Sequence, residues 1–146
     1  MNIKEYLSQA KYLDAQIDSK VRQLTRLRSL ATKCTSAITG MPHSKSADTS
    51  SMENSITKLI DLENEINDEI DKLVNLKEEI MKVIKCVDKL EHRMILEKRY
   101  IDFKSWDRIA SEMFFTRRYV HKLHGRALEQ AAKIYGKIKK EDTKGH

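Results

Sequence analysis

Basic side chains are concentrated in the last third of this sequence, at spacings that can place several of them on one side of a helix. Arg117, Arg118, His121 and Lys122 lie within six residues of one another. A guanidinium group can pair bidentately with guanine or hold a phosphate. Residues 116–140 carry 8 basic side chains and a single acid, Glu129. This imbalance favours a phosphate-bearing partner over an ordinary solvated helix.

The sequence contains little that resembles a catalytic or metal-binding motif. The sequence has no Gly-rich phosphate loop and no nucleophile elbow, and its acidic residues are spread around a helix instead of converging. Cys34 and Cys86 lack paired spacing, and His121 and His124 have no third ligand close by in the sequence. We therefore expect a protein that is not an enzyme, with reduced cysteines and with neither a metal nor a cofactor.

The elements that must position the basic residues are predicted to be helices. Only 4 Gly and 1 Pro occur in 146 residues, which leaves too few turns for a sandwich, a barrel or a series of βαβ units. Charged residues make up 34% of the chain, so little apolar material remains for one large core. The composition predicts an all-α protein with a small domain and an extended helical arm.

The first helix is marked by apolar residues at spacings of three and four, typical of a coiled-coil seam. Asn2 and Glu5 form a candidate capping box at its start, and Gly40 and Pro42 supply its end. The seam consists of Ile3, Tyr6, Ala10, Leu13, Ile17, Val21, Leu24, Leu27, Ala31, Cys34 and Ile38.

A polar stretch of about residues 41–52 is predicted to be a linker, after which Ser50 and Glu53 offer a second capping box. The second seam consists of Ile56, Leu59, Leu62, Ile66, Ile70, Leu73, Leu76, Ile80, Ile84 and Val87. Residues 1–36 have a net charge of +4 and residues 53–91 of −5, so the two helices should attract each other. The linker is too short to run back along a helix of about 35 residues, so a pair within one chain must be antiparallel. The same seams could also pair between chains.

Three shorter helices are predicted after Asp88, over residues 90–101, 105–113 and 116–140. Ser105 and Thr116 are the candidate N-caps at the two joints. The predicted domains are therefore a helical hairpin at residues 1–88 and a small module with a basic tail at residues 89–146. The inward faces of this module should carry Ile109, Ala110, Met113, Phe115, Val120, Leu123 and Ala127.

Residues 105–128 resemble the helix-turn-helix of sigma factor region four and of the phage late transcription regulators of the ArpU and RinA type. The resemblance is carried by Trp106, Ile109-Ala110, Thr116-Arg117-Arg118 with Val120, and Arg126-Ala127-Leu128. Residues 94–101 match the first helix of that module. The resemblance covers about 40 of the 146 residues.

One residue departs from the family pattern. Phe114 stands where the motif usually has Gly at a turn with a positive φ. A bulky residue in that conformation costs on the order of 1 kcal/mol or more. We therefore expect either another type of turn or a Phe114 ring that is held by packing.

The resemblance implies a sequence-specific DNA-binding transcription regulator of phage or prophage origin, in the cytoplasm of a bacterial host cell. Double-stranded DNA would be its partner, RNA polymerase an implied further contact, and the N-terminal helices a means of self-association. The absence of a long apolar segment argues against a membrane partner. The residues expected to contact DNA are Thr116, Arg117, Arg118, Tyr119, His121, Lys122 and Arg126.

Two other functions are consistent with the same residues. A phage DNA-packaging subunit, similar to a small terminase, would recognise genome ends and assemble into a ring. A coiled-coil interaction adaptor would use the basic module to bind an acidic protein. A ring of many subunits would favour the first alternative, and a lack of competition by duplex DNA would favour the second.

Overall fold

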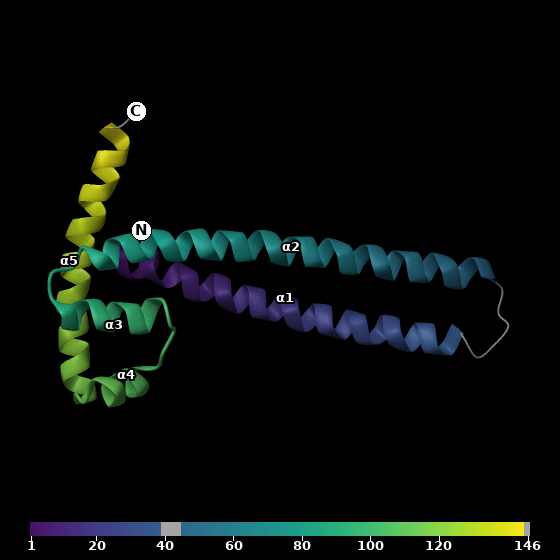
Figure 1. Cartoon of the computed structure of the whole chain (residues 1–146), viewed down its shortest axis with the longest axis horizontal. Coiled ribbons are helices and arrows are strands. Elements are labelled where there is room, and N and C mark those ends of the chain that lie inside the picture. Colours follow the sequence, from purple (N-terminus) through teal and green to yellow (C-terminus); the bar gives the residue numbers. More distant parts are fainter. Residues whose placement is uncertain (39–44, 145–146) are drawn as a thin grey trace. The chain divides into compact units, whose positions relative to one another are not determined.

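The computed structural model describes the backbone of residues 1–38 and 45–144 and the side chains of residues 1–33 and 51–144. The described elements are all helices, which confirms the predicted all-α class (Figure 1). No helix within these residues is long and apolar enough to cross a membrane. The helices are α1 (Ile3–Ile38), α2 (Lys45–Lys85), α3 (Leu90–Tyr100), α4 (Trp106–Met113) and α5 (Arg117–Lys144).

The start of α1 is the predicted capping box. The Glu5 backbone N–H donates to Asn2 Oδ1 at 2.8 Å, and the Asn2 backbone N–H donates to Glu5 Oε2 at 3.3 Å. Two backbone N–H groups at the helix start thereby gain side-chain acceptors. Gly40 and Pro42, predicted to end this helix, lie outside the described residues, as does the side chain of Cys34. Cys86 carries a free, exposed thiol.

The start of α2 differs from the prediction. The helix begins at Lys45, so residues 45–52, predicted to belong to the linker, are helical, and Ser50 is not an N-cap. Residues 43–52 contain neither Gly nor Pro. Ser, Thr and Asp reduce helix propensity by only a few tenths of a kcal/mol each, which is insufficient to end a helix.

The chain consists of two compact units. The second unit, Leu13–Lys72, contains parts of α1 and α2. Ile17 and Leu24 of α1 and Ile66 of α2 are buried there. Lys20 forms ion pairs with Glu65 and Glu69, and Arg28 with Glu63. Because partners later in α1 lie earlier in α2, the two helices run antiparallel within this unit.

The first unit joins Met1–Tyr12 to Leu73–His146. Its largest core cluster draws on four helices, so the end of α2 and the start of α1 share one core with α3 and α5. The boundary predicted after Asp88 lies inside this unit. The cluster consists of Tyr6, Leu7 and Ala10; Ile80, Val83, Ile84 and Val87; Leu96 and Tyr100; and Ala127 and Ala131.

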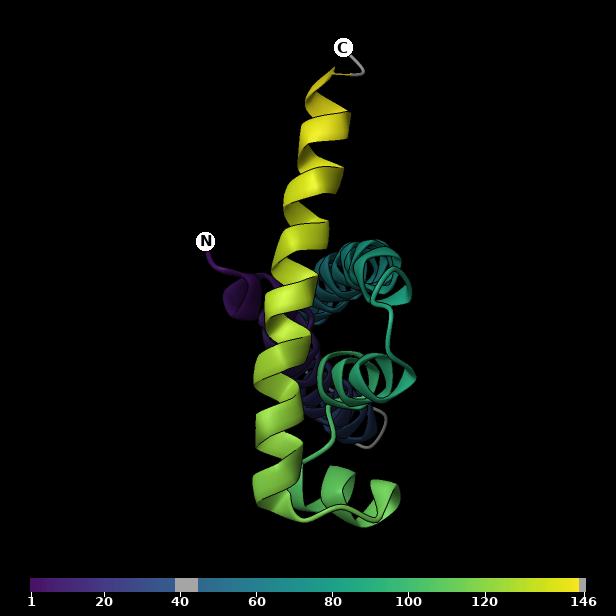
Figure 2. The ribbon, with the colours of Figure 1, turned by 90° about the vertical axis from the view of Figure 1, so that its left-hand side faces the viewer.

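The three C-terminal helices begin and end close to their predicted bounds, and α3 and α4 both pack on α5 (Figure 2). A second core cluster joins them through Ile95, Ile109, Ala110, Val120 and Leu123, with Trp106, Met113 and Phe115 packed against it. Six of the seven predicted core residues of the module are members of this cluster or pack on it. The seventh, Ala127, is buried in the larger cluster.

Candidate nucleic-acid interface

Two hydroxyl groups cap the helices on either side of the turn that leads into α5. Ser105 Oγ accepts a hydrogen bond from the Arg108 backbone N–H at 3.3 Å. Thr116 Oγ1 accepts one from the Tyr119 backbone N–H at 3.2 Å. Both predicted N-caps are therefore confirmed. Thr116, which was also expected to contact DNA, thus uses its hydroxyl to hold the first turn of α5.

The turn after α4 has the left-handed geometry that the family pattern usually assigns to Gly. Phe114 has φ 58° and ψ 36°, and the residue is 94% exposed. Both expectations for this residue are therefore wrong, because the turn is not of another type and the ring is not packed. Backbone hydrogen bonds hold the turn instead, since the Phe114 N–H donates to Ser111 O and the Phe115 N–H donates to Ala110 O.

Phe103, in the connection between α3 and α4, also has a positive φ of 57°. Its ring, unlike that of Phe114, packs against the large core cluster. The Lys77 ammonium lies 4.7 Å from the centre of this ring. Packing thus offsets the backbone strain at Phe103, whereas nothing within the described residues covers the ring of Phe114.

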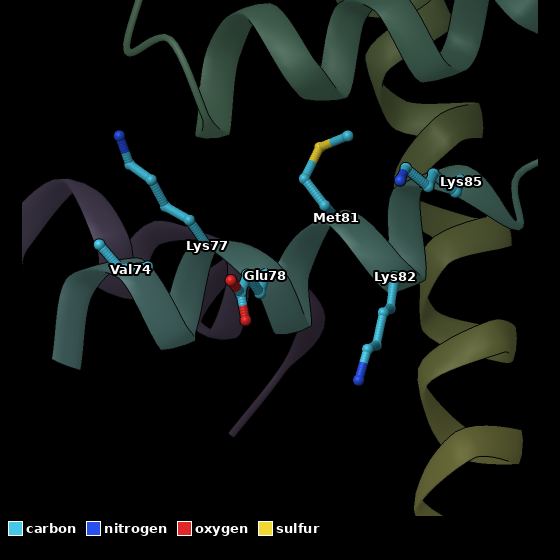
Figure 3. A pocket seen from close by; sticks show the side chains of 6 residues that line it. All are labelled: Val74, Lys77, Glu78, Met81, Lys82 and Lys85. Atoms are coloured by element: carbon cyan, nitrogen blue, oxygen red, sulfur yellow. The ribbon is translucent and has the colours of Figure 1, made fainter. Parts of the chain in front are cut away.

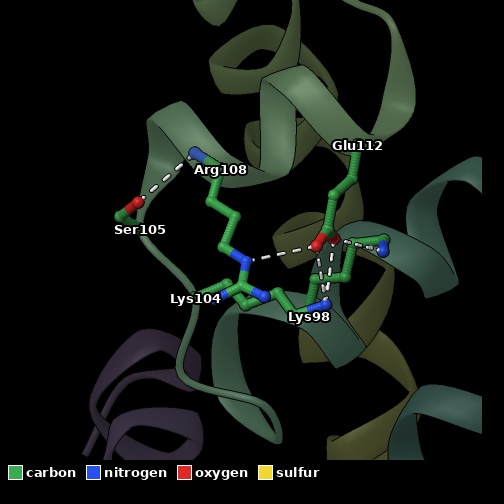
Figure 4. Close-up of polar contacts among 5 residues, drawn as sticks. All are labelled: Lys98, Lys104, Ser105, Arg108 and Glu112. Atoms are coloured by element: carbon green, nitrogen blue, oxygen red, sulfur yellow. Dashed lines mark hydrogen bonds and ion pairs between the residues drawn. The ribbon is translucent and has the colours of Figure 1, made fainter.

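Glu112 of α4 joins three cations, one each from α3, the α3–α4 connection and α4 itself (Figure 4). Lys98 Nζ lies 2.7 Å from Glu112 Oε2, Lys104 Nζ lies 2.9 Å from the same oxygen, and Arg108 Nε lies 3.3 Å from Oε1. Hydrogen bonds from Lys98 and Lys104 lower the pKa of Glu112 to about 2. Sequence reasoning missed this network because Lys98 is 14 residues away from Glu112.

A buried polar pair joins the end of α3 to α5. The Tyr100 hydroxyl lies 2.7 Å from His124 Nε2. Burial lowers the pKa of His124 to about 4, with further contributions from nearby Lys4, His121 and Arg99, and burial raises the pKa of Tyr100 to about 12. At neutral pH the Tyr100 hydroxyl is therefore hydrogen-bonded to an uncharged imidazole.

Trp106 packs against two histidines of α5. The ring centres of Trp106 and His121 lie 4.7 Å apart, and those of Trp106 and His124 lie 4.6 Å apart. Arg99 covers the Trp106 ring at 4.5 Å. Trp106 therefore has a packing role, and His121, although exposed, is held on one side by the indole ring.

Of the four Arg and Lys residues that were expected to contact DNA, one forms an ion pair and three do not. Arg117 Nη1 lies 3.2 Å from Asp107 Oδ1 of α4. Arg118, Lys122 and Arg126 are exposed and form no ion pair with any residue that the structure describes. Their spacing of four residues places all three along one side of α5. The outward side of this helix thus presents three unpaired cations.

Tyr119 extends the same side of the first turns of α5. The residue is 41% exposed, and its ring meets Phe115 edge-on, with the ring centres 4.9 Å apart. A shallow hollow of about 260 Å³ is lined by Thr116, Arg118, Tyr119 and Lys122. The hollow therefore combines two cations, a hydroxyl and an aromatic ring at the start of α5.

The positive charge at this end of α5 is unfavourable for the isolated protein. Arg117 and Arg118 occupy the first turn, where the helix macrodipole disfavours cations by about 0.3–1 kcal/mol each. Asp107 offsets this for Arg117. No described acid does so for Arg118, so an anion bound at this surface would relieve an existing electrostatic strain.

Within the described residues there is no group of three or more His, Cys, Asp or Glu side chains that could hold a metal ion. Comparisons of the chain with protein-family models, with curated proteins and with solved structures find no match.

Proposed function

We propose that α4, the turn at Phe114 and α5 act as a helix-turn-helix, as in sigma factor region four, in a protein whose α1 and α2 form an antiparallel hairpin. The chain would be a sequence-specific DNA-binding transcription regulator of phage or prophage origin. The observation that carries the proposal is the row of unpaired cations Arg118, Lys122 and Arg126 on the outward side of α5. It follows directly after a capped turn, which is the position of a recognition helix in this motif.

The geometry of the turn supports the same proposal. The two backbone hydrogen bonds at Phe114 and Phe115, the Thr116 cap and the Arg117–Asp107 pair fix the direction in which α5 leaves α4. A recognition helix needs such a fixed direction, because its first turns must enter the major groove while the preceding helix crosses the DNA backbone. The sequence resemblance adds RNA polymerase to the proposed partners.

Binding of duplex DNA from the chain's own genomic neighbourhood tests the proposal. Labelled fragments are titrated with protein at two salt concentrations and in the presence of random competitor DNA. We expect one fragment to bind tightly in spite of the competitor. Affinity that is weak, equal for all fragments and lost at moderate salt would contradict sequence-specific recognition.

A matched pair of double variants locates the surface. Arg118→Ala/Lys122→Ala and Lys133→Ala/Lys137→Ala each remove two positive charges from α5. We expect the first variant to lose at least about 10-fold in affinity for the preferred fragment and the second to lose much less, because one lost bidentate contact is worth about 1–3 kcal/mol. Equal losses would show that α5 contributes only general charge.

A further inference from the structure

A second row of apolar side chains runs along α2, apart from the residues that are buried in the two units. Ile56, Ile60, Ile70 and Val74 are 47%, 52%, 40% and 50% exposed. Ile66, by contrast, is only 6% exposed. Two members of the predicted seam, Ile56 and Ile70, therefore lie in the exposed row and not in the buried core.

The row has the spacing of a helix-pairing surface. Its positions alternate by three and four residues, which keeps them on one side of a helix that pairs with another. Glu63 and Asn67 lie at its middle, Glu53 at its N-terminal end and Lys77 at its C-terminal end. The complete row is Glu53, Ile56, Ile60, Glu63, Asn67, Ile70, Val74 and Lys77.

The row is symmetric about residue 65: positions at equal distances before and after this residue carry side chains that can pair with each other. Ile56 and Val74 are both nine residues from that centre, and Ile60 and Ile70 are both five residues from it. Glu63 and Asn67 flank it, and Glu53 and Lys77 stand at equal distances of twelve residues. An antiparallel copy therefore meets each apolar residue with an apolar one and each terminal charge with its opposite.

We propose that a second copy of this chain packs antiparallel against this row of α2, with the twofold axis near residue 65. The pairing is isologous, so each contact occurs twice. At its centre the Asn67 amide can donate to Glu63, whose carboxylate already pairs with Arg28 of α1. In a parallel pairing Glu63 would face Glu63 and Glu53 would face Glu53, and these like charges disfavour that orientation.

A hollow lies at the C-terminal end of the row. Its volume is about 490 Å³, and Lys77 and Met81 project toward the same side of α2 (Figure 3). In the proposed register Ile56 of the second copy meets Val74 at the edge of this hollow. The full lining is Val74, Lys77, Glu78, Met81, Lys82 and Lys85. The row includes none of the basic residues of α5, so this proposal does not depend on the proposed function.

Sedimentation equilibrium of the full chain tests the surface. We expect the wild-type protein to be a dimer, and Ile60→Glu and Ile70→Glu each to raise the dimer Kd on the order of 100-fold, because each change affects two apolar contacts and places a charge in them. Leu30→Glu is the matched control, since Leu30 is 57% exposed on α1 and lies outside the row. It should leave the dimer Kd unchanged. A monomeric wild-type protein, or equal effects of all three changes, would overturn the proposal.

Charge reversal tests the antiparallel register. Glu53→Lys alone brings two positive charges together across the pair, and Lys77→Glu alone brings two negative charges together. Each should raise the dimer Kd by about 3- to 10-fold, and the double variant should restore the wild-type value. Far-UV circular dichroism checks that Lys77→Glu, which also removes the Phe103 contact, keeps its helicity. A double variant that is no tighter than the single ones would overturn this register.

Discussion

The Arg117 guanidinium lies 3.2 Å from the Asp107 carboxylate, whereas the neighbouring Arg118 forms no ion pair among the described residues. The two adjacent arginines therefore differ in the protein without DNA, because only Arg117 has an acidic partner. Binding to a phosphate or a base would require Arg117 to exchange an existing partner, but would give Arg118 its first. The distinction was not visible in the sequence, where Arg117 and Arg118 are equivalent candidates.

Single alanine variants should separate the two arginines. We expect Arg118→Ala to reduce affinity for the preferred DNA fragment by about 10-fold or more and Arg117→Ala to reduce it less. Arg117→Ala should lower the free energy of unfolding by no more than about 1 kcal/mol, because its ion pair is exposed. Fluorescence anisotropy and urea denaturation measure the two effects. A larger loss of affinity for Arg117→Ala would reverse the assignment.

Replacing Phe114 by Gly should stabilise the protein. Gly relieves the positive φ, worth about 1 kcal/mol, and almost no packing is lost because the residue is 94% exposed. Phe103→Gly is the matched control, since it relieves the same strain but removes a ring packed on the core. Thermal unfolding should show a higher Tm for Phe114→Gly and a lower Tm for Phe103→Gly. Destabilisation by Phe114→Gly would mean that the ring has a packing partner.

Local hydrogen-bonding patterns were predictable from the sequence. The capping box at Asn2 and Glu5 and the caps at Ser105 and Thr116 depend on groups three residues apart, so their spacing indicated them. The same spacing at Ser50 and Glu53 lies inside α2 and does not mark a helix start. The helices of the C-terminal module and its core residues followed from these caps and from apolar periodicity. The cations of α5 were identified from the excess of basic residues in that segment.

Features that depend on distant parts of the chain were not predictable. Periodicity placed Ile66 and Ile70 in the same seam, although Ile66 is buried and Ile70 is exposed. Apolar residues at spacings of three and four mark one side of a helix, but they do not specify which edge of that side a partner covers. The Glu112 network brings together residues from two helices and their connection. Phe103 has a positive φ, although its residue type does not signal such a conformation.

His124 should make stability depend on pH in the mildly acidic range. Its pKa is lowered by burial from about 6.5 to about 4, so the unfolded state binds a proton more readily than the folded state. The free energy of unfolding should therefore be constant above about pH 7 and fall as pH decreases from 6.5 to 4, by up to about 1.4 kcal/mol per pH unit. Urea denaturation of wild type and His124→Gln between these values measures it. An equally steep fall in the variant would assign the effect to other groups.

Ile84 should be required for the folding of α3 and α5 as well as of α2. It is 1% exposed in the cluster that joins α1 and α2 to Leu96 and Ala131, so Ile84→Ala should cost about 2–5 kcal/mol. Hydrogen exchange should then accelerate throughout the first unit, residues 89–146 included. Ile66→Ala is the comparison, because Ile66 lies in the second unit, and its effect should be confined to Leu13–Lys72. Unchanged protection of α3 and α5 in Ile84→Ala would instead support an independent module that begins after Asp88.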